Sequence, residues 1–167
     1  MNINSVESCQ MDYNSLYYNI ENGDIFLKTK YFYKQTDYTE FIKHIIMVTN
    51  NSVNLKETHF HEKTFNIFID LEDTKLKNFD RDFLKQLIKF LEDHYPDRVN
   101  KIYFKNASVM FKSIWTIIRP FIGRDTRKKI IFEKKIKVNK PLNKPLNKYN
   151  EHVQIVQITE DNIDDLF

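Results

Sequence analysis

Residues 95–132 carry the pattern that decides the fold: YPDRVNKIYFKNASVMFKSIWTIIRPFIGRDTRKKIIF. Tyr-Pro-Asp-Arg at 95–98 predicts the end of a helix, because a proline disfavours helical geometry at the residue before it. A short strand is expected at 101–105. Asn-Ala-Ser at 106–108 then offers side-chain acceptors to the free N–H groups of a new helix. With a last strand expected at 129–132, helices and strands alternate within this one stretch.

The helix expected at 108–122 is unusually apolar. Its apolar residues are Val109, Met110, Phe111, Ile114, Trp115, Ile117, Ile118, Phe121 and Ile122. Its polar strip is narrow and consists of Lys112, Ser113, Thr116 and Arg119. A surface helix normally has a narrower apolar stripe than this one. We therefore expect the helix to contact apolar material on two sides, one of which is not protein.

The segments before residue 95 repeat the same alternation. Strands are expected at 25–33 (IFLKTKYFY) and 65–71 (FNIFIDL), from their aromatic and β-branched residues. Helices are expected at 38–49, where Asn50-Asn51-Ser52 would end the helix, and directly after Asp80, which would cap the second one. Residues 53–63 fit either a continuation of the first helix or a loop. This alternation predicts an α/β fold with a mainly parallel sheet and right-handed crossovers.

The composition divides the chain into four parts. Residues 1–24 are polar and resemble a loosely held leader, and residues 25–133 form the α/β core. Residues 134–150 contain Lys-Pro-Leu-Asn twice and are expected to be an extended linker. In residues 151–167, the alternating HVQIVQIT predicts an edge strand, which an acidic tail follows.

Length and composition limit the class of protein. A chain of 167 residues with 41% apolar residues can bury the core of one domain. Cys9 is the only cysteine, so no disulfide framework is expected and the compartment is expected to be reducing. The N-terminus has no signal-peptide pattern, and no apolar run is long enough to span a bilayer. We therefore expect a cytoplasmic protein whose contact with membranes is peripheral.

The charge is small overall and uneven along the chain. A net charge of +3 is too low to suggest nucleic-acid binding, and no nucleic-acid partner is expected. Residues 124–148, however, carry ten Lys or Arg residues against two acidic ones. Such a block favours an anionic membrane surface, at about 1 kcal/mol per basic residue. The alternative is a solvated loop whose lysine excess reflects codon usage.

Enzyme signatures are weak. With only Gly23 and Gly123, neither a phosphate-binding loop nor a dinucleotide fingerprint can form. His59 and His61, beside Glu62, have no third ligand at metal spacing, so no metal site is expected. The chain is predicted not to be an enzyme, although a small hydrolase with an unrecognised site stays open as a rival.

Several motifs together resemble the CRAL-TRIO (Sec-fourteen-like) lipid-binding domain of phosphatidylinositol and phosphatidylcholine transfer proteins. They are Tyr95-Pro96-Asp97-Arg98, Asn106-Ala107, Phe111 with Trp115, Arg119-Pro120-Phe121, Thr126 with Lys129-Ile130, and upstream Phe68-Ile69-Asp70-Leu71. The resemblance covers about residues 25–132. It implies a CRAL-TRIO-like lipid-binding fold and a bound phospholipid, with no cofactor.

The resemblance also assigns a head-group site. In family members that bind phosphatidylinositol, the acid of the Tyr-Pro-acid-Arg turn and a later lysine contact the inositol phosphate, and they match Asp97 and Lys129. Thr126 and Arg98 are expected beside them. A carboxylate can accept from inositol hydroxyls while an ammonium pairs with the phosphodiester. The alternative is a surface ion pair of Asp97 with Lys129 or Arg98, which stabilises little.

The apolar helix corresponds to the family's moving gate. The resemblance implies that acyl chains contact its apolar residues, which are Phe111, Ile114, Trp115, Ile118 and Phe121. Trp115 would suit the membrane interface. The basic residues expected to face membrane phosphates are Arg119, Arg124, Arg127 and Lys128.

The chain departs from the family pattern at three places. Asp97 replaces the usual Glu, and Ser108 stands where proline is common. Residues 1–24 do not match the family's N-terminal helical bundle, so one wall of the cavity would be covered by a second copy in a homodimer or by the segment from His152 onward. The predicted function is the binding and transfer or presentation of a phospholipid, either phosphatidylinositol or a phosphoinositide. The rival is the same fold with a filled cavity, used as a protein-interaction module of the small-GTPase-regulator type.

Overall fold

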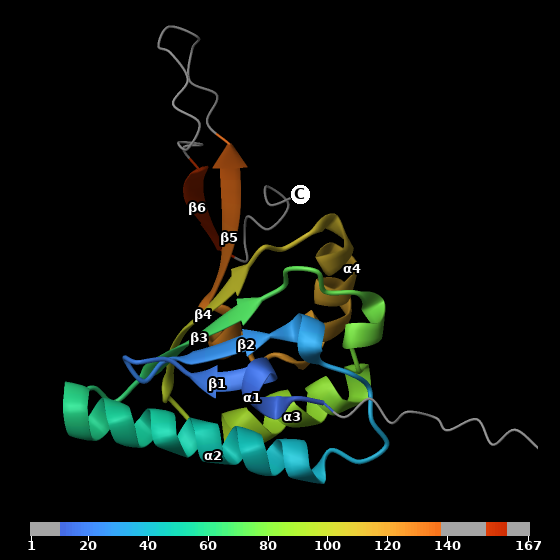
Figure 1. Ribbon diagram of the computed structural model, residues 1–167. Helices are drawn as coiled ribbons and strands as arrows, with labels where there is room; N and C mark the ends of the chain where they lie inside the picture. The colour runs from blue at the N-terminus through green and yellow to red at the C-terminus, as the bar shows by residue number, and fades with distance from the viewer. Residues whose placement is uncertain (1–10, 138–152, 160–167) are drawn as a thin grey trace, which may run out of the picture.

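A single mixed sheet forms the centre of the computed structural model, which describes residues 11–137 and 153–159. Within these residues the sheet has six strands, and their order in the sheet is their order in the chain (Figure 1). The strands are β1 (Tyr17–Asn19), β2 (Ile25–Lys28), β3 (Phe65–Asp70), β4 (Val99–Lys105), β5 (Ile130–Lys137) and β6 (Val153–Thr159). The four central strands are parallel, whereas β1 and β6 pair antiparallel at the edges. The predicted α/β class with a mainly parallel sheet is confirmed.

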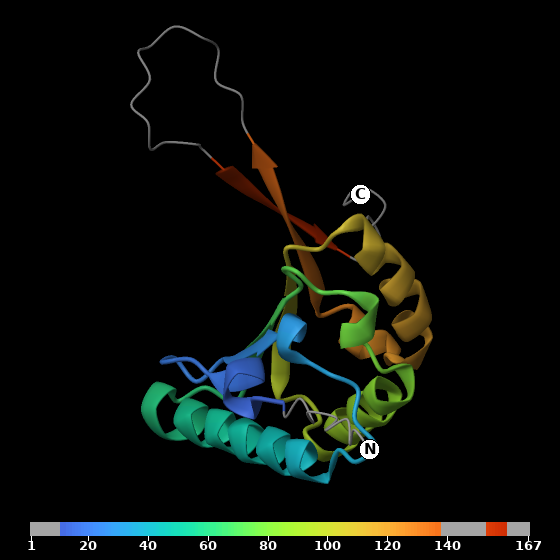
Figure 2. The ribbon, with the colours of Figure 1, turned by 45° about the vertical axis from the view of Figure 1, so that its right-hand side comes forward.

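Three helices connect the parallel strands. They are α2 (Thr39–Leu55), α3 (Arg81–His94) and α4 (Val109–Ile118). Because successive strands step in one direction across the sheet, right-handed crossovers place all three helices on the same face. Figure 2 shows this arrangement, with the other face of the sheet turned away from the helices. The shorter elements are α1 (Tyr13–Leu16), η1 (Thr29–Tyr31), the π-helix η2 (Lys56–Phe60), η3 (Leu76–Asn78), η4 (Arg119–Phe121) and α5 (Arg124–Arg127).

Helix α3 begins and ends as its sequence predicts. Asp80 is its N-cap, and one carboxylate oxygen accepts from the backbone N–H groups of Asp82 and Phe83, both at 3.1 Å. Burial alone would raise the pKa of Asp80, but these hydrogen bonds, the Tyr38 hydroxyl and the Lys34 ammonium together lower it. The helix stops at His94, directly before the turn that contains Pro96.

Helix α2 is longer than the sequence predicts. The expected end at Asn50-Asn51-Ser52 is wrong, because the helix continues to Leu55 and then through the π-helix η2. Asn50 and Asn51 lie on the solvent side. Ser52 is buried and its hydroxyl donates to the carbonyl of Gly23, so a polar residue occupies the inner face without interrupting the helix.

The expected strand at 25–33 is shorter than predicted. Strand β2 ends at Lys28, after which η1 turns the chain so that Phe32 enters the core. The expectation of a loosely held leader is wrong for residues 11–24. Leu16 and Tyr17 are buried, and β1 pairs with β2 through the register Tyr18↔Phe26. A strand of only three residues gives too few alternations to be read from its sequence.

The other edge of the sheet agrees with the sequence from residue 153 onward. Strand β6 pairs antiparallel with β5, which confirms the predicted edge strand. Strand β5 extends to Lys137, so residues 134–137 are part of the sheet and not of a linker. The rest of the expected linker, residues 138–150, and the acidic tail lie outside the described residues.

The core fills the space between the sheet and the helices in two clusters. One surrounds Phe41 and Phe83, below α2 and α3. The other surrounds Trp115 and Phe132, below α4. Ile69 and Ile102 are partly buried and pack against both clusters, so they mark the place where the two meet.

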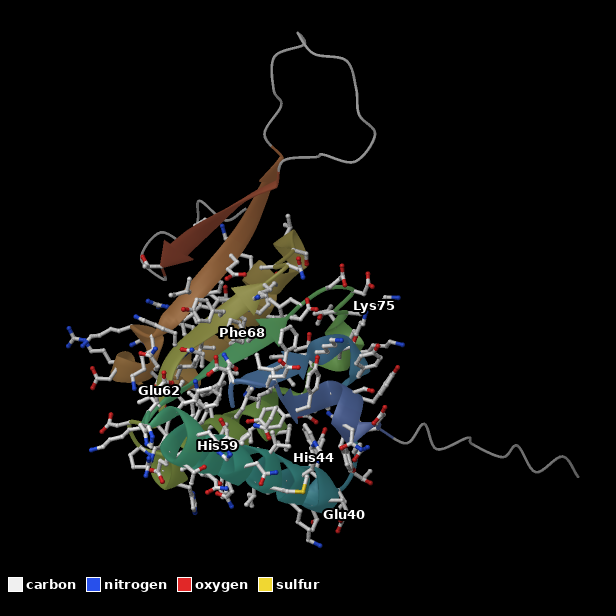
Figure 3. The ribbon with its side chains drawn as sticks, turned by 60° about the vertical axis from the view of Figure 1, so that its left-hand side comes forward. Glu40, His44, His59, Glu62, Phe68 and Lys75 are labelled. Carbon is white, nitrogen blue, oxygen red and sulfur yellow. The ribbon has the colours of Figure 1, made fainter. Side chains whose placement is uncertain are left out.

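The opposite face of the sheet carries a row of partly exposed aromatic side chains. Tyr18, Phe26, Phe68 and Tyr103 lie in register across β1 to β4, and Phe68 is labelled in Figure 3. Neighbouring rings are stacked, with centroids 5.8, 6.1 and 4.9 Å apart along the row. Because these side chains alternate with the core residues of the same strands, they face away from the helices.

A buried ion pair joins the end of α2 to the start of β2. Lys56 Nζ lies 3.1 Å from Asp24 Oδ1 and 2.8 Å from Glu62 Oε2. Asp24 also accepts from the backbone N–H of Asn66 at 2.9 Å, which ties the pair to β3. Burial opposes the charge of Lys56, but its hydrogen bonds to the two carboxylates outweigh that effect and raise its pKa. Glu62 is labelled in Figure 3.

Candidate functional site

An apolar cavity of about 200 Å³ lies between the sheet and the helices. Its walls include Ile69 and Phe104 from the sheet, Leu84 and Leu87 from α3, and Ile114 and Ile118 from α4. None of the residues that line it carries a charged side chain. The space can therefore hold hydrocarbon, and its lining offers no charged group that would pair with an ion.

A second compartment of about 350 Å³ adjoins the first. The two share six wall residues, which are Tyr17, Ile67, Ile88, Leu91, Ile102 and Thr126. The second compartment also has ionic residues in its lining, namely Glu92, Asp97, Arg124, Asp125 and Lys129. An apolar space thus lies directly beside one with a charged lining.

Helix α4 covers the apolar cavity, and three of the five residues predicted to contact acyl chains line it. Phe111, Ile114 and Ile118 line the cavity. Trp115 is not among the lining residues, which differs from the expectation. Its ring packs edge-on against Phe132 with centroids 5.1 Å apart. Because Trp115 follows Phe111 by four residues, it shares the helix face that lies on the sheet.

Trp115 is also not placed for contact with a membrane in this structure. Its side chain is only 3% exposed. Among the α4 side chains that the structure describes, the exposed apolar ones are instead Val109 and Ile117, at 72% and 41% exposure. The sequence could not separate these roles, because the helix is apolar on most of its circumference.

Phe121 is likewise absent from the cavity lining. It lies in η4, partly buried, where the Lys85 ammonium and the Arg81 guanidinium stand 5.1 and 6.0 Å from its ring centroid. Both cations come from α3. Phe121 therefore attaches the end of the α4 segment to the outside of α3.

Asp97 and Lys129, which the resemblance paired, do come together at the second compartment. Lys129 Nζ lies 4.0 Å from Asp97 Oδ1, and both residues line the compartment. Asp97 has a left-handed backbone with φ of 58° and a fully exposed side chain. An ion pair this exposed adds little to stability, so both groups are available to a ligand.

Arg98 lines neither compartment in this structure, which differs from the expectation that it joins the head-group site. Its guanidinium donates to Glu57 and to the carbonyl of Lys63, the latter at 3.3 Å. These contacts hold the turn after α3 to η2 and to the segment that follows it. The sequence could not show this, because the two partners lie 41 and 35 residues before Arg98.

Thr126 is joined to a residue that the sequence reasoning missed. Its hydroxyl donates to Glu92 Oε1 at 2.6 Å, and the backbone N–H of Gly123 donates to the same oxygen at 3.0 Å. A Cβ at Gly123 would lie 3.0 Å from this oxygen, so glycine permits the close approach. Glu92 resembles any solvent-facing acid of an amphipathic helix, and its one local signal is its position four residues after Ile88 on the cavity face of α3.

The predicted basic residues divide between the compartment and the surface. Arg124 lines the second compartment. Arg119 and Lys128 are exposed, and Arg127 is partly buried. Lys128 Nζ lies 2.8 Å from Asp125 Oδ1 and lowers the pKa of that carboxyl. Lys128 does not line either compartment.

Tyr17 supplies a buried polar group to the shared wall. Burial raises its pKa to about 12, so the hydroxyl keeps its proton at neutral pH. Tyr17 Oη lies 3.2 Å from Thr49 Oγ1, which itself donates to the carbonyl of Ile45 at 2.7 Å. Tyr17 is therefore the donor in the pair, and its proton is already used within the protein.

Two further findings concern the part of the chain that the structure describes. No helix in it combines the length and the apolar character needed to cross a bilayer. Over the same residues, His, Cys, Asp and Glu side chains form no group of three that could hold a metal ion. His59 is exposed and lies 2.7 Å from the Thr58 hydroxyl.

The fold and the paired compartments define an α/β chain that encloses an apolar cavity beside a charged lining. The CRAL/TRIO domain family model matches residues 21–159. The chain therefore belongs to the CRAL/TRIO domain family, which confirms the resemblance.

Two of the similar curated proteins are named as phosphatidylinositol/phosphatidylcholine transfer proteins. Phosphatidylinositol/phosphatidylcholine transfer protein SFH7 of Arabidopsis thaliana is 34% identical over 64 residues, which is 36% of this chain and 12% of SFH7. Phosphatidylinositol/phosphatidylcholine transfer protein SFH12 of the same plant is 26% identical over 106 residues, covering 57% of this chain and 19% of SFH12. This chain thus spans less than a fifth of either relative.

A solved structure supports the fold. The crystal structure of Sfh5 has a TM-score of 0.52 at 16% identity, and the match covers 70% of this chain and 47% of Sfh5. At this identity the likeness concerns the fold alone. It agrees with the predicted CRAL-TRIO-like architecture.

Proposed function

We propose that this chain binds a phospholipid, with phosphatidylinositol as the preferred head group, and presents or transfers it at membrane surfaces. The observation that carries the proposal is the apolar cavity without charged lining residues, joined to a second compartment whose lining holds both signs of charge. An amphiphile requires this combination of a hydrocarbon site and a polar site. The names of the relatives SFH7 and SFH12 support the same class of ligand.

The apolar cavity supplies most of the binding free energy in this proposal. Each methylene transferred from water to an apolar site contributes about 0.8 kcal/mol. A charge-assisted hydrogen bond contributes only about 1.5–3 kcal/mol. The acyl chain, lying between Leu84, Leu87 and Ile118, therefore provides most of the affinity for the lipid. The polar compartment selects the head group.

The polar compartment offers complementary groups to a phosphatidylinositol head group. Lys129 and Arg124 can pair with the phosphodiester. Asp97 and Glu92 can accept hydrogen bonds from inositol hydroxyls. The arrangement keeps the roles that the family resemblance assigned to Asp97 and Lys129, and replaces Arg98 by Arg124.

We also propose that α4 faces the membrane during lipid exchange. Its exposed residues Val109 and Ile117 are apolar, and the exposed Arg119 and Arg124 follow within a few residues. Apolar side chains beside basic ones suit an anionic bilayer surface. Movement of α4 would uncover the cavity that Ile114 and Ile118 close.

Native mass spectrometry of the purified full chain, followed by lipid extraction, tests the proposal. The expected result is a co-purifying phospholipid. Ile118→Trp should reduce the bound fraction, because a larger side chain would occupy the cavity. The matched control is Ser113→Trp, at an exposed position of the same helix that lines neither compartment. A wild-type chain that carries no lipid and transfers none between vesicles would refute the proposal.

A protein-interaction module is the second candidate function. The observation that favours it is the row of partly exposed aromatic rings, including Phe26 and Phe68, on the face opposite the helices. Parallel sheets are usually covered on both faces. A lipid-free chain that captures a partner, with loss of capture in Phe68→Ser, would make this function the better one.

A further inference from the structure

We propose that Glu92 is a specificity-determining residue of the second compartment. Its carboxylate admits a head group that combines hydroxyls with one phosphodiester, and excludes a head group that carries an additional phosphate monoester. This inference rests on the proposed function, and it narrows the expected ligand from phosphoinositides in general to phosphatidylinositol itself.

The position of Glu92 is fixed by two hydrogen bonds. Gly123 N–H and the Thr126 hydroxyl both donate to Oε1, at 3.0 and 2.6 Å. Oε2 also lies close to Gly123, and it has no hydrogen-bond partner among the described residues. The carboxylate is therefore held by one oxygen, and the other oxygen stays free to accept a hydrogen bond in the compartment that Glu92 lines.

The same hydrogen bond sets the role of Thr126. Because its hydroxyl proton is directed to Glu92, Thr126 offers only lone pairs in other directions. Thr126 lies in the wall that both spaces share, and Glu92, which lines the second compartment, is hydrogen-bonded to it, so the two are neighbouring acceptors at this boundary. Two acceptors at this boundary match the hydroxyl donors of an inositol ring.

The charges in the compartment lining are unfavourable to a second phosphate. Three carboxylates, of Glu92, Asp97 and Asp125, face two cations, of Arg124 and Lys129. Both cations can contact one phosphodiester, but with three carboxylates in the same lining no positive charge is left over for a second phosphate. A phosphate monoester would add a further charge of about −1.5 to −2 at neutral pH. That charge would meet the carboxylate of Glu92, because its hydrogen bonds keep this side chain from turning away.

Competition binding with the full chain tests this inference. Vesicles of phosphatidylcholine would contain either phosphatidylinositol or phosphatidylinositol 4-phosphate, and extraction of each lipid would be measured. Glu92→Gln keeps an oxygen that accepts from Gly123 and Thr126 but removes the charge. We expect it to raise the ratio of phosphatidylinositol 4-phosphate to phosphatidylinositol by about tenfold, since a like charge at this range is unfavourable. Asp93→Asn, at the exposed neighbouring position, should leave the ratio unchanged.

A second variant separates charge from structure. Glu92→Asp keeps the carboxylate and should keep the rejection of the monoester, even where total lipid binding falls. An unchanged ratio in a folded Glu92→Gln protein that still extracts phosphatidylinositol would overturn the role of Glu92 and leave the proposed function intact. Equal extraction of both lipids by the wild-type chain would do the same. Extraction of neither lipid would refute the proposed function, and this inference with it.

Discussion

Replacing Lys129 by alanine should separate head-group recognition from folding. Lys129 lines the second compartment, and among the described residues its ion pair is the 4.0 Å contact with the exposed carboxylate of Asp97. Such a pair stabilises a fold little, so Lys129→Ala should unfold at the same denaturant concentration as the wild type. The effect is expected in lipid binding instead.

The size of that effect follows from the contact that is lost. A hydrogen bond between an ammonium and a phosphate is charge-assisted and contributes about 1.5–3 kcal/mol. With a tenfold change for each 1.4 kcal/mol, the loss corresponds to about 10- to 150-fold in affinity for phosphatidylinositol. Partial exposure of Lys129, at 30%, favours the lower end of this range. Phosphatidylcholine should lose less, because its choline cation already offsets the phosphate charge.

Transfer of labelled lipid between donor and acceptor vesicles would measure both head groups in parallel. Lys89→Ala is the matched control, because Lys89 is an exposed residue of α3 that lines neither compartment. Equal losses for phosphatidylinositol and phosphatidylcholine, or an equal loss in the control, would show that Lys129 does not select the head group.

Three further outcomes are expected. Ile117→Glu should weaken binding to anionic vesicles by about tenfold without removing bound lipid, since burial of an Ile side chain contributes about 1.5–3 kcal/mol. A vesicle sedimentation assay that shows no change in binding would exclude α4 as the membrane-facing element. Asp24→Asn should lower the free energy of unfolding by about 3 kcal/mol, because Lys56 stays buried with only one of its two carboxylate partners. Glu40→Gln, which removes an exposed ion pair, is the control, and an equally small loss of unfolding free energy in both variants would contradict this prediction. The folded state holds the pKa of Asp80 below its usual value, so its stabilisation is complete above about pH 4 and disappears as pH falls through the folded pKa. The unfolding free energy of Asp80→Asn should therefore differ less between neutral and acidic pH than that of the wild type, as measured by urea titration. An equal pH difference in the variant and the wild type would argue against the role of Asp80 as a charged helix cap.

The elements that the sequence located well are those with strong local signals. The run FNIFIDL at 65–71 contains mostly residues that favour strands, and it forms β3. Asp80 before a helical apolar period gave the start of α3, and the turn at Pro96 gave its end. Asp97 and Lys129 were paired by the family motif, and the structure brings them together. The first two cases depend on neighbouring residues, whereas the pairing of Asp97 with Lys129 depended on the family resemblance.

The failures concern features that depend on contacts distant in the sequence. The strand Tyr17–Asn19 exists because β2 provides an edge for it, and no periodicity marks three residues. Trp115 faces the sheet because Phe132 lies beneath it, yet a helix apolar on most sides shows no preferred face. Glu92 gained its place in the site through Gly123 and Thr126, which lie 31 and 34 residues further along.

The agreement between strand order and chain order has a consequence for biosynthesis. Every strand pairs with the strand made just before it, so no strand must wait for a distant partner before its backbone groups are satisfied. The sheet can grow by one strand and one helix at a time as the chain leaves the ribosome. The segment that covers the cavity, α4, is made after four of the strands are complete. Until then the nascent chain exposes the walls of its apolar cavity, and a hydrophobic molecule or a chaperone can reach them at that stage.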